Sequence, residues 1–598
     1  MAAPLLAEEP ELAYPRLIEL GIALSAEHNH PRLLEKILLG AKEMTNADGG
    51  TLYLVSEGGR ELRFMIMRND TMGMALGGST GAPVPFPPVP LRDPDGSPNY
   101  KSVVAAAALT GETINLADAY HAPGFDFSGT RAFDARTGYR SQSFLNVPLK
   151  NHEAEVVGVL QLINARSPDG QTIAFPAEIM PLIEALAGQA AVALDNQRLI
   201  EAQRNLFRAV LKVFASAIDA KSAYTGGHCH RVPDLTNMLA RAADEAEAGP
   251  LADFHLTELE WYELEVAGGL HDCGKVTTRE FVVDKATKLE TIYNRIHEIR
   301  ARFEIVKRDA EIEYLRAVMA GGDEPALRAA CDARLADLDD DFAFVAECNI
   351  GGEFMAPEKI ARLQRIARIT WLRTLDDRLG LSWEESARQP QTRASLPATE
   401  ELLADKPSHI IEHDVAPVPA DNPWGFVVTP PPHKANLGEV YNLSIRRGTL
   451  TEEERYHIND HIVQTIIMLE ALPYPKHLRR VPEWAGGHHE KMDGTGYPRR
   501  LKREQMSIPA RIMMIADIFE ALSARDRPYK ARKKLSECID IMASMSREHH
   551  IDPDLFELFL TSGVYRQYAD KFLLPEQIDD VDIGCYLGTL APREPVVA

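Results

Sequence analysis

Histidine and aspartate residues with the donor atoms of a metal site recur at five places in this sequence. All of the donors are nitrogen or oxygen atoms, a set that suits divalent first-row metals such as iron or manganese, with zinc and nickel as alternatives. Two such ions about 3.5–4 Å apart can clamp a phosphodiester and lower the pKa of a bound water. In chain order the candidate ligands are His228, His271, Asp272, His461, His488, His489 and Asp517.

Taken one at a time, these residues also have simpler structural explanations. A lone buried histidine such as His461 is usually a hydrogen-bonded core residue. Asp517 interrupts an apolar run, and because an unpartnered buried carboxylate is costly it needs a metal ion or an arginine such as Arg511. Adjacent side chains point to opposite faces of a strand and diverge by about 100° on a helix. His488 and His489 can therefore share a site only on irregular backbone.

The flanking sequence predicts how several of these residues are presented. Thr451 and Glu454 have the spacing of a capping box, which predicts a helix from about residue 452 with His461 on its buried stripe. Lys275 follows His271 by four residues, so the two are expected on one face.

The segment "HHEKMDGTGYP" at residues 488–498 predicts a stiff, irregular loop. Gly494 and Gly496 permit unusual backbone conformations, and Pro498 restricts the loop further.

These segments together resemble the HD-GYP domain, a family of bacterial cyclic di-GMP phosphodiesterases within the HD superfamily. The resemblance rests on "HDCGK", "GTLTEEERYHINDH", "HHEKMDGTGYP", "IADIFEALSARDRPYK" and "HIDPDLFELFL", which occur in the family's order. It covers residues 222–276 and 441–565, and it implies an all-α domain that hydrolyses cyclic di-GMP to pGpG, GMP or both.

The resemblance also implies roles for individual residues. Two divalent transition metal ions, iron or manganese, would be bridged by Asp272. One ion would be completed by His228, His271 and Asp517, and the other by His461, His488 and His489. The expected catalytic residues are His271, Asp272 and Lys275, with Lys275 contacting the bridging hydroxide or the phosphate. The expected substrate-binding residues are Lys275, Arg446, Arg447, Gly496, Tyr497, Pro498, Arg527 and Lys530.

The chain departs from the family pattern directly after Lys275. The family's next motif resumes only in "LSIRRGTLTEEE", which begins at residue 443, so residues 277–440 are predicted to be a largely helical insertion. Two charged helical segments joined at residues 321–323 predict an antiparallel pair, expected to act as a lever or partner surface more than as an independent core. The insertion is expected either to gate the site or to be a surface hairpin.

Residues 15–177 predict an α/β domain with an antiparallel sheet. "GTLYLV" and "LRFMIM" are joined across glycines and predict a hairpin, and further strands are predicted at "SFLNVPL" and "EVVGVLQLIN". The segment from "DAYHAPGF" to "GVLQLIN" resembles GAF domains of cyclic-nucleotide phosphodiesterases. The family's Asn-Lys-Phe signature is broken here, because Asn164 is followed by Ala165 and Arg166. The alternatives are an unknown small ligand or a structural, dimerising role.

Residues 178–221 have almost no glycine or proline and carry apolar residues at helical spacing. They predict a long connector helix, either a plain surface helix or, as we expect from its length, the dimerising element of a homodimer. Residues 1–14 and 566–598 are predicted to be tails. The predicted architecture is thus multidomain: GAF-like sensor, connector helix, and an all-α HD-GYP domain with a helical insertion.

Composition limits the partners. The chain has 598 residues and a net charge of −23, which predicts several domains and disfavours a nucleic acid polymer as ligand. Its apolar runs are interrupted and its start lacks the pattern of a signal peptide, so a cytoplasmic protein without a membrane span is expected. Six scattered cysteines without a CxxC pair predict reduced thiols.

Three functions are compatible with these features. The leading hypothesis is hydrolysis of cyclic di-GMP under control of the GAF-like domain. The second is a phosphodiesterase of another cyclic nucleotide. The third is a non-catalytic, nucleotide-binding signalling receptor, which the large insertion favours and the full ligand set disfavours.

Overall fold

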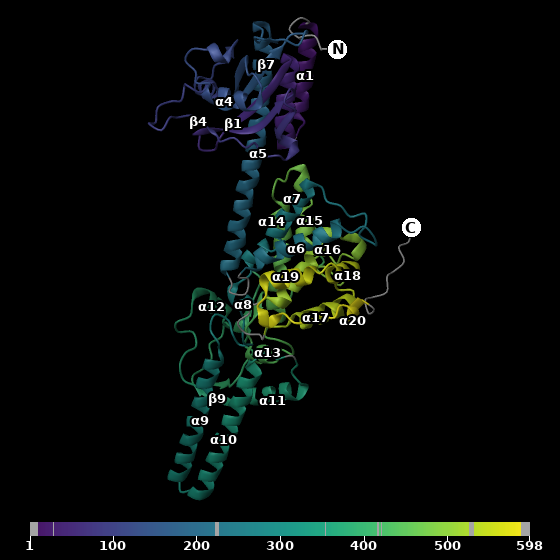
Figure 1. The fold of residues 1–598 in the computed structure, drawn as a ribbon. Coiled ribbons are helices and arrows are strands. Elements are labelled where there is room, and N and C mark those ends of the chain that lie inside the picture. Colours follow the sequence, from purple (N-terminus) through teal and green to yellow (C-terminus); the bar gives the residue numbers. More distant parts are fainter. Residues whose placement is uncertain are drawn as a thin grey trace. The chain divides into compact units, whose positions relative to one another are not determined.

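The computed structural model describes residues 10–27, 29–221, 227–352, 354–415, 418–419, 421–524 and 532–587 (Figure 1). The chain divides into two compact units, Met1–Phe207 and Arg208–Ala598, which are described separately below. Arg527 and Lys530, two of the predicted substrate-binding residues, lie outside the described residues.

The N-terminal unit is built on one antiparallel sheet with the strand order β3-β2-β1-β7-β6-β5. The predicted hairpin is confirmed, because β1 (Ala47–Val55) pairs with β2 (Glu61–Asn69). The predicted strands at "SFLNVPL" and "EVVGVLQLIN" are also present. The remaining bounds are β3 (Met74–Gly77), β4 (Val89–Pro90), β5 (Ile114–Leu116), β6 (Phe144–Lys150), β7 (Val156–Arg166) and β8 (Thr172–Ile173).

Side chains alternate between the two faces along each strand, and this sheet carries apolar side chains on both faces. Helices cover both faces of the sheet and bury these side chains. Leu160 and Leu162 of β7 join a core with α1 (Pro10–Ser25), α2 (His30–Thr45) and the start of α5 (Met180–Lys221). Val159 faces the other way and joins a second core with α3 (Val103–Thr110). A further helix, α4 (Ser128–Thr137), lies in the segment before β6. This is the α/β architecture with an antiparallel sheet that the sequence predicted.

The long helix α5 occupies the predicted connector. By length and composition alone, Ala177–Ala220 is apolar enough to cross a membrane, with a mean hydropathy of 1.4 in a window that is 39% buried. This differs from the prediction that the apolar runs of the chain are too interrupted for a membrane span. Part of this apolar character has a clear structural use, because Ile183, Leu186 and Leu194 are buried in the sheet core. One such helix is weak evidence of a membrane span.

The second unit is a helical domain whose elements come from both sides of the predicted insertion. α6 packs on α7 and α16, and α14 packs on α15. The predicted capping box is confirmed, since Thr451 and Glu454 close the start of α14. The bounds are α6 (His228–Asp244), α7 (Glu258–Leu270), α14 (Glu452–Glu470), α15 (Val481–Gly486), α16 (Ile508–Ser523), α17 (Leu535–Arg547), α18 (Pro553–Thr561) and α19 (Val564–Phe572).

The segment between α7 and α14 contains the predicted helical pair, α9 (Ile296–Met319) and α10 (Glu324–Asn349), which lie side by side (Figure 1). The ion pair of Lys307 with Asp339 fits their antiparallel direction. The helical pair contributes to a buried apolar cluster that contains Phe303, Val345 and Leu363 and also Leu443, which lies beyond the predicted insertion. The other elements are α8 (Glu280–Val283), α11 (Pro357–Ala367), β9 (Thr370–Arg373), α12 (Trp383–Arg388), β10 (Ala398–Glu401), β11 (Ile410–Ile411), β12 (Ala435–Asn436) and α13 (Glu439–Leu443).

Both predicted tails contain regular structure. At the N-terminus α1 begins at Pro10. At the C-terminal end, α19 continues to Phe572 and α20 spans Gly584–Leu587. Tyr568 of α19 is 1% exposed, and the Gln577 side chain donates to Ser523 O at 3.0 Å. This part of the chain therefore packs on the helical unit, unlike the predicted tail.

Candidate metal centre

The seven predicted ligands lie in two groups inside the helical unit. One group contains His228, His271, Asp272 and Asp517, and the other contains His461, His488 and His489. Within each group the candidate ligand atoms are all within 4.8 Å of one another. Residues far apart in the sequence thus form two adjoining candidate metal sites of histidine and aspartate.

Five separate segments supply these side chains. His228 begins α6, and His271 and Asp272 follow the last turn of α7. His461 lies within α14 and Asp517 within α16. The remaining two histidines follow α15, whose last residue is Gly486. Helix ends and the middle turns of two helices therefore deliver the donors to one place.

The turn after Asp272 packs closely on α14. A Cβ atom on Gly274 would lie 1.9 Å from the carbonyl oxygen of His461 and 2.6 Å from the amide nitrogen of Thr465. The backbone N–H of Gly274 donates to the Thr465 hydroxyl at 2.9 Å. Only glycine fits this approach, which brings Asp272 next to the second group.

Asp272 lies between the two groups and turns one oxygen to each. Its Oδ2 is 3.1 Å from Nε2 of His228 and 3.2 Å from Nε2 of His271. Its Oδ1 is 3.3 Å from Nε2 of His461 and 3.9 Å from Nε2 of His488. The side chain is 2% exposed. This is the arrangement that a bridging carboxylate requires.

Acceptors behind the histidines fix the ring orientation. Nδ1 of His271, His461 and His488 lies 2.7, 2.6 and 2.7 Å from the carbonyl oxygens of residues 268, 458 and 485. A carbonyl oxygen only accepts, so each Nδ1 must carry the proton. In the neutral ring Nε2 then has a free lone pair directed into the cluster, which is the form that binds metals.

Several of these inward atoms are unsatisfied. Among the described residues, Nε2 of His271, Nε2 of His488 and Oδ1 of Asp272 are buried without a hydrogen-bond partner. Leaving a buried polar atom unpaired costs roughly 1–3 kcal/mol. Three such atoms converging on one place fit bound cations, so the donor set and its geometry are compatible with divalent metal ions.

The protonation of the cluster follows from burial and charge. Burial lowers the pKa of His488 to about 4, so this ring is neutral near pH 7. Burial opposes ionisation of Asp517, yet its hydrogen bond with His228 keeps the Asp517 pKa well below its usual range. Burial likewise opposes the charge of Lys275, but the adjacent Asp272 raises the Lys275 pKa. Near pH 7 these shifts leave Asp517 ionised and His488 neutral, and both forms can bind a metal ion.

The loop after His489 closes one side of the second group. The ring of Tyr497 stacks on His489 with centroids 5.0 Å apart and planes at 12°, and Nε2 of His489 is 3.0 Å from Nε2 of His461. Gly494 has a φ of 80°. Gly496 does not have a positive φ. Glycine is needed there for space, because a Cβ atom at this position would lie 2.3 Å from the amide nitrogen of residue 491.

Adjacent histidines share this site because they lie beyond the end of a helix. α15 ends at Gly486, and residues 487–489 form turns. The two imidazole centroids are only 4.2 Å apart, with planes at 44°. Irregular backbone thus lets both rings face the same group, as the sequence required of them.

Glu520 is part of this site, although it is not among the residues predicted from the sequence. Its carboxylate accepts a hydrogen bond from Nδ1 of His228 and is also held by Nε of Arg231 at 2.7 Å. The side chain is 1% exposed. Glu520 follows Asp517 by three residues on α16, so the spacing itself was a usable signal.

Ion pairs show which residues lie beside Asp517 and where Lys275 lies. Arg511, considered as the partner of Asp517, instead pairs with Asp552. Asp517 Oδ1 lies 3.2 Å from Nε2 of His228. Lys275 Nζ donates to Oδ2 of Asp272 at 2.5 Å, so the predicted lysine does lie at the cluster.

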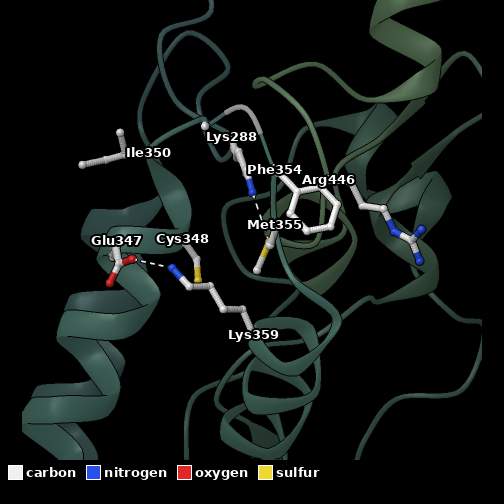
Figure 2. A pocket seen from close by; sticks show the side chains of 9 residues that line it. Lys288, Glu347, Cys348, Ile350, Phe354, Met355, Lys359 and Arg446 are labelled. Carbon is white, nitrogen blue, oxygen red and sulfur yellow. Dashed lines mark hydrogen bonds and ion pairs between the residues drawn. The ribbon is translucent and has the colours of Figure 1, made fainter.

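Arg446 and Arg447 are not brought to the cluster by any hydrogen bond or ion pair of the described residues. Arg447 is exposed. Arg446 lines a separate cavity of about 240 Å³ with Lys288, Cys348 and Lys359. Figure 2 shows its guanidinium pointing away from the Lys359–Glu347 ion pair. Their predicted role in substrate binding therefore stays a prediction.

In the N-terminal unit, Asn164 has a structural use of its own. Its Oδ1 accepts from the backbone N–H of Gln142 at 2.7 Å, and its Nδ2 donates to the Tyr139 hydroxyl at 2.9 Å. Arg166, where the cyclic-nucleotide signature has another residue, pairs with buried Asp48. These contacts tie the end of β7 to the segment before β6 and to β1.

Comparisons with known proteins agree with these two units. Residues 29–194 match the GAF domain family and residues 397–555 match the HD domain family. The HD match contains His461, His488, His489 and Asp517, and it does not reach the ligands that precede the insertion.

Relatives of known function align over parts of the helical unit. The chain is 41% identical over 83 residues to 3'3'-cGAMP-specific phosphodiesterase 1 of Vibrio cholerae, which is 14% of this chain and 19% of that protein. It is 35% identical over 140 residues to a cyclic di-GMP phosphodiesterase of Thermotoga maritima, which is 23% of this chain and 37% of that protein. The aligned segments thus span well under two thirds of these relatives. Separate parts of the chain thus match the GAF domain family and the HD domain family.

Proposed function

We propose that this protein is a metal-dependent phosphodiesterase that hydrolyses cyclic di-GMP to pGpG, GMP or both. The observation that carries the proposal is Asp272, whose two oxygens face two separate groups of buried donors. Matches to phosphodiesterases of cyclic di-GMP and 3'3'-cGAMP support the reaction class. The choice of cyclic di-GMP over other cyclic dinucleotides is the more specific part of the proposal, and it is based on the resemblance of the Gly496–Tyr497–Pro498 loop to the HD-GYP family.

Two divalent ions, iron or manganese, are the proposed cofactors. His228, His271 and Asp517 would hold one, His461, His488 and His489 the other, and Asp272 would belong to both. When bound, such a pair neutralises phosphodiester charge and supplies hydroxide at neutral pH. The Nδ1 contacts orient the rings before any ion binds, so little reorganisation is needed.

Other side chains of the chain would act on the substrate directly. Lys275 carries a positive charge 2.5 Å from Asp272 and is 28% exposed, so its ammonium can also meet a phosphate oxygen. Tyr497 covers His489 and would form a wall for the substrate. Gly496 and Pro498 give that wall its shape.

The N-terminal unit is proposed to regulate this activity by binding an unidentified small ligand, with α5 as the connector of a cytoplasmic homodimer. Exposed apolar residues along α5 support the dimer. Val192, Leu199, Leu206 and Val213 recur every seven residues and are 45%, 57%, 67% and 69% exposed. A seven-residue apolar repeat is the pattern of a helix that pairs with another helix.

Turnover by metal-reconstituted protein tests the proposed function. Protein loaded with Fe²⁺ or Mn²⁺ under reducing conditions should linearise cyclic di-GMP, and His271→Ala should abolish cleavage while circular dichroism shows an intact fold. Parallel reactions with 3'3'-cGAMP and with cyclic mononucleotides decide the substrate. Tight binding of cyclic di-GMP without turnover in any metal would favour a signalling receptor instead.

A further inference from the structure

A short segment of the insertion, residues 422–428, lies against the loop that follows His489. The backbone N–H of Val427 donates to the carbonyl oxygen of Pro498 at 2.7 Å. From the loop side, Nε of Arg499 donates to the carbonyl oxygen of Trp424 at 2.9 Å. The insertion is therefore hydrogen-bonded to the Tyr497–Pro498–Arg499 stretch in both directions. We call residues 422–428 the clamp segment.

The clamp segment has a fixed conformation of its own. The Asn422 side chain, 9% exposed, accepts from the backbone N–H groups of Trp424 and Phe426 at 3.1 and 2.9 Å. Its amide donates back to the carbonyl oxygens of Pro419 and Phe426, each at 2.9 Å. One side chain thus satisfies four backbone groups of the turn, so the segment can act as a rigid support.

Phe426 attaches this turn to the helix that carries His461. Its side chain is 4% exposed and clusters with Ile462, Val463 and Ile466 of α14. Tyr497 and Trp424 pack against the same cluster, and Trp424 stacks on Phe426 with centroids 5.7 Å apart and planes at 13°. An apolar anchor of the insertion is therefore shared by α14 and by the loop.

The contacts continue from the clamp segment to the metal centre. Pro498, which the clamp holds, follows Tyr497, whose ring lies on His489 and whose N–H donates to the His489 carbonyl at 3.2 Å. Glu490 holds the other end by accepting from the backbone N–H groups of Arg499 and Leu501 at 2.7 and 2.9 Å. Arg499 is also paired with Glu470 of α14 at 3.2 Å.

We propose that the insertion holds the Tyr497–Pro498 loop in place over the second group of donors through the clamp segment, with Phe426 and Val427 as positioning residues. Because Asn422 and Phe426 of the clamp segment are buried and the segment is hydrogen-bonded to the loop in both directions, its role is to fix the loop rather than to open and close over it. Any effect of the clamp segment on substrate cleavage rests on the proposed phosphodiesterase function. The positioning of the loop does not depend on that function.

Hydrogen exchange on the full-length, Mn²⁺-loaded protein tests the positioning without any turnover. Phe426→Ala should speed exchange of the backbone amides in residues 494–501 by about tenfold or more, because their support is lost. Metal content should stay at the wild-type level. Trp383→Ala is the matched control, since it also removes an aromatic ring from the insertion but at a site that is 85% exposed.

A second variant separates the hydrogen bond from packing. Val427→Pro removes the N–H that Pro498 accepts, while the Val427 side chain is 46% exposed and fills no core. It should give the same faster exchange in a folded protein, even if Phe426→Ala folds poorly. Unchanged exchange in a folded Val427→Pro, or equal acceleration in Trp383→Ala, would overturn the proposal.

Kinetics add the link to the reaction. If wild-type protein cleaves cyclic di-GMP, Phe426→Ala should lower kcat/KM by about 10–100-fold, since a small displacement of a positioning group has effects of this size. Trp383→Ala should match wild type. If wild-type protein cleaves nothing, the proposed function fails, and the exchange experiment still decides whether the clamp segment holds the loop.

Discussion

Glu520 accepts a hydrogen bond from Nδ1 of His228 inside the helical unit, and neither side chain is more than 8% exposed. Burial raises the pKa of Glu520, but the contacts with His228 and Arg231 outweigh it and lower that pKa below its ordinary value. An ionised carboxylate only accepts, so Nδ1 of His228 carries the proton. Nε2 of His228 is then turned toward Asp272 and Asp517, where a metal ion would lie.

This relationship predicts that Glu520→Gln weakens metal binding although Glu520 is not itself a proposed ligand. The amide can donate to Nδ1 and so favour the wrong tautomer of His228. Loss of such a supporting group typically lowers metal affinity by about 10–100-fold. Competition with a chelator, read by elemental analysis, measures this. Glu265→Gln, at a 39% exposed ion pair, is the control, and equal affinity in both variants would contradict the prediction.

Replacement of Asp272 should affect both groups of donors at once. Asp272→Ala removes the oxygens that face His228 and His461, so the bound metal should fall toward zero. Asp517→Ala removes a donor from one group only and should lower the metal content by about half if two ions bind. Elemental analysis of proteins purified side by side gives both values. Full occupancy in Asp272→Ala would refute the bridging assignment.

Gly274→Ala should destabilise the helical unit. Its methyl group would lie 1.9 Å from the His461 carbonyl oxygen, which is backbone and cannot move aside without shifting α14. Overpacking of this kind costs about 1–3 kcal/mol. Gly269→Ala is the matched control, because its Cβ meets nothing nearer than 3.8 Å. Thermal unfolding of both variants should show a lower Tm for Gly274→Ala alone.

Asp552 should make the free energy of unfolding depend on pH in the acidic range. Burial raises its pKa, but Arg511 and Arg503 outweigh burial and lower the pKa below that of an unfolded aspartate. The resulting stabilisation is complete above the unfolded pKa of about 4 and is lost as pH falls through the lower folded pKa. Asp552→Asn should be less stable by about 3 kcal/mol at pH 7. Chemical denaturation at pH 7 and pH 3 should show a smaller pH effect in that variant.

Leu206→Glu should dissociate the proposed homodimer. Leu206 is 67% exposed in one chain, and a charge on the paired face of two helices is strongly unfavourable. Light scattering after gel filtration should report a monomer for this variant and a dimer for wild type. Glu201→Gln, an exposed change on the same helix, is the control. A monomeric wild-type protein would remove the basis for the dimer.

Much of the site could be predicted because its signals are local in sequence. The capping box at Thr451 and the β1–β2 hairpin depend on spacings of a few residues. Each of the seven candidate ligands likewise stands in a short motif that is read from neighbouring residues. The GAF and HD-GYP resemblances then joined the separate pieces. Glu520 had the same kind of local signal, three residues after Asp517, but a glutamate in an apolar helix has many other uses.

Other features depended on contacts that no local pattern encodes. The need for glycine at position 274 comes from α14, which is nearly 190 residues further along the chain. The buried cluster beside α9 and α10 was hidden because both helices carry many charged residues, and apolar residues such as Phe303 and Val345 are buried with partners such as Leu363 and Leu402 that lie elsewhere in the sequence.

The sequence by itself indicated which residues can bind metal and that a helix from about residue 452 carries His461, because residue chemistry and helix periodicity are local properties. Only the tertiary structure decided that Asp272 turns one oxygen to each group, that Arg511 pairs with Asp552, and that Phe426 of the insertion supports the Tyr497 loop. Those outcomes depend on packing between segments that are far apart in the sequence, and no local pattern specifies which of several chemically equivalent partners is reached.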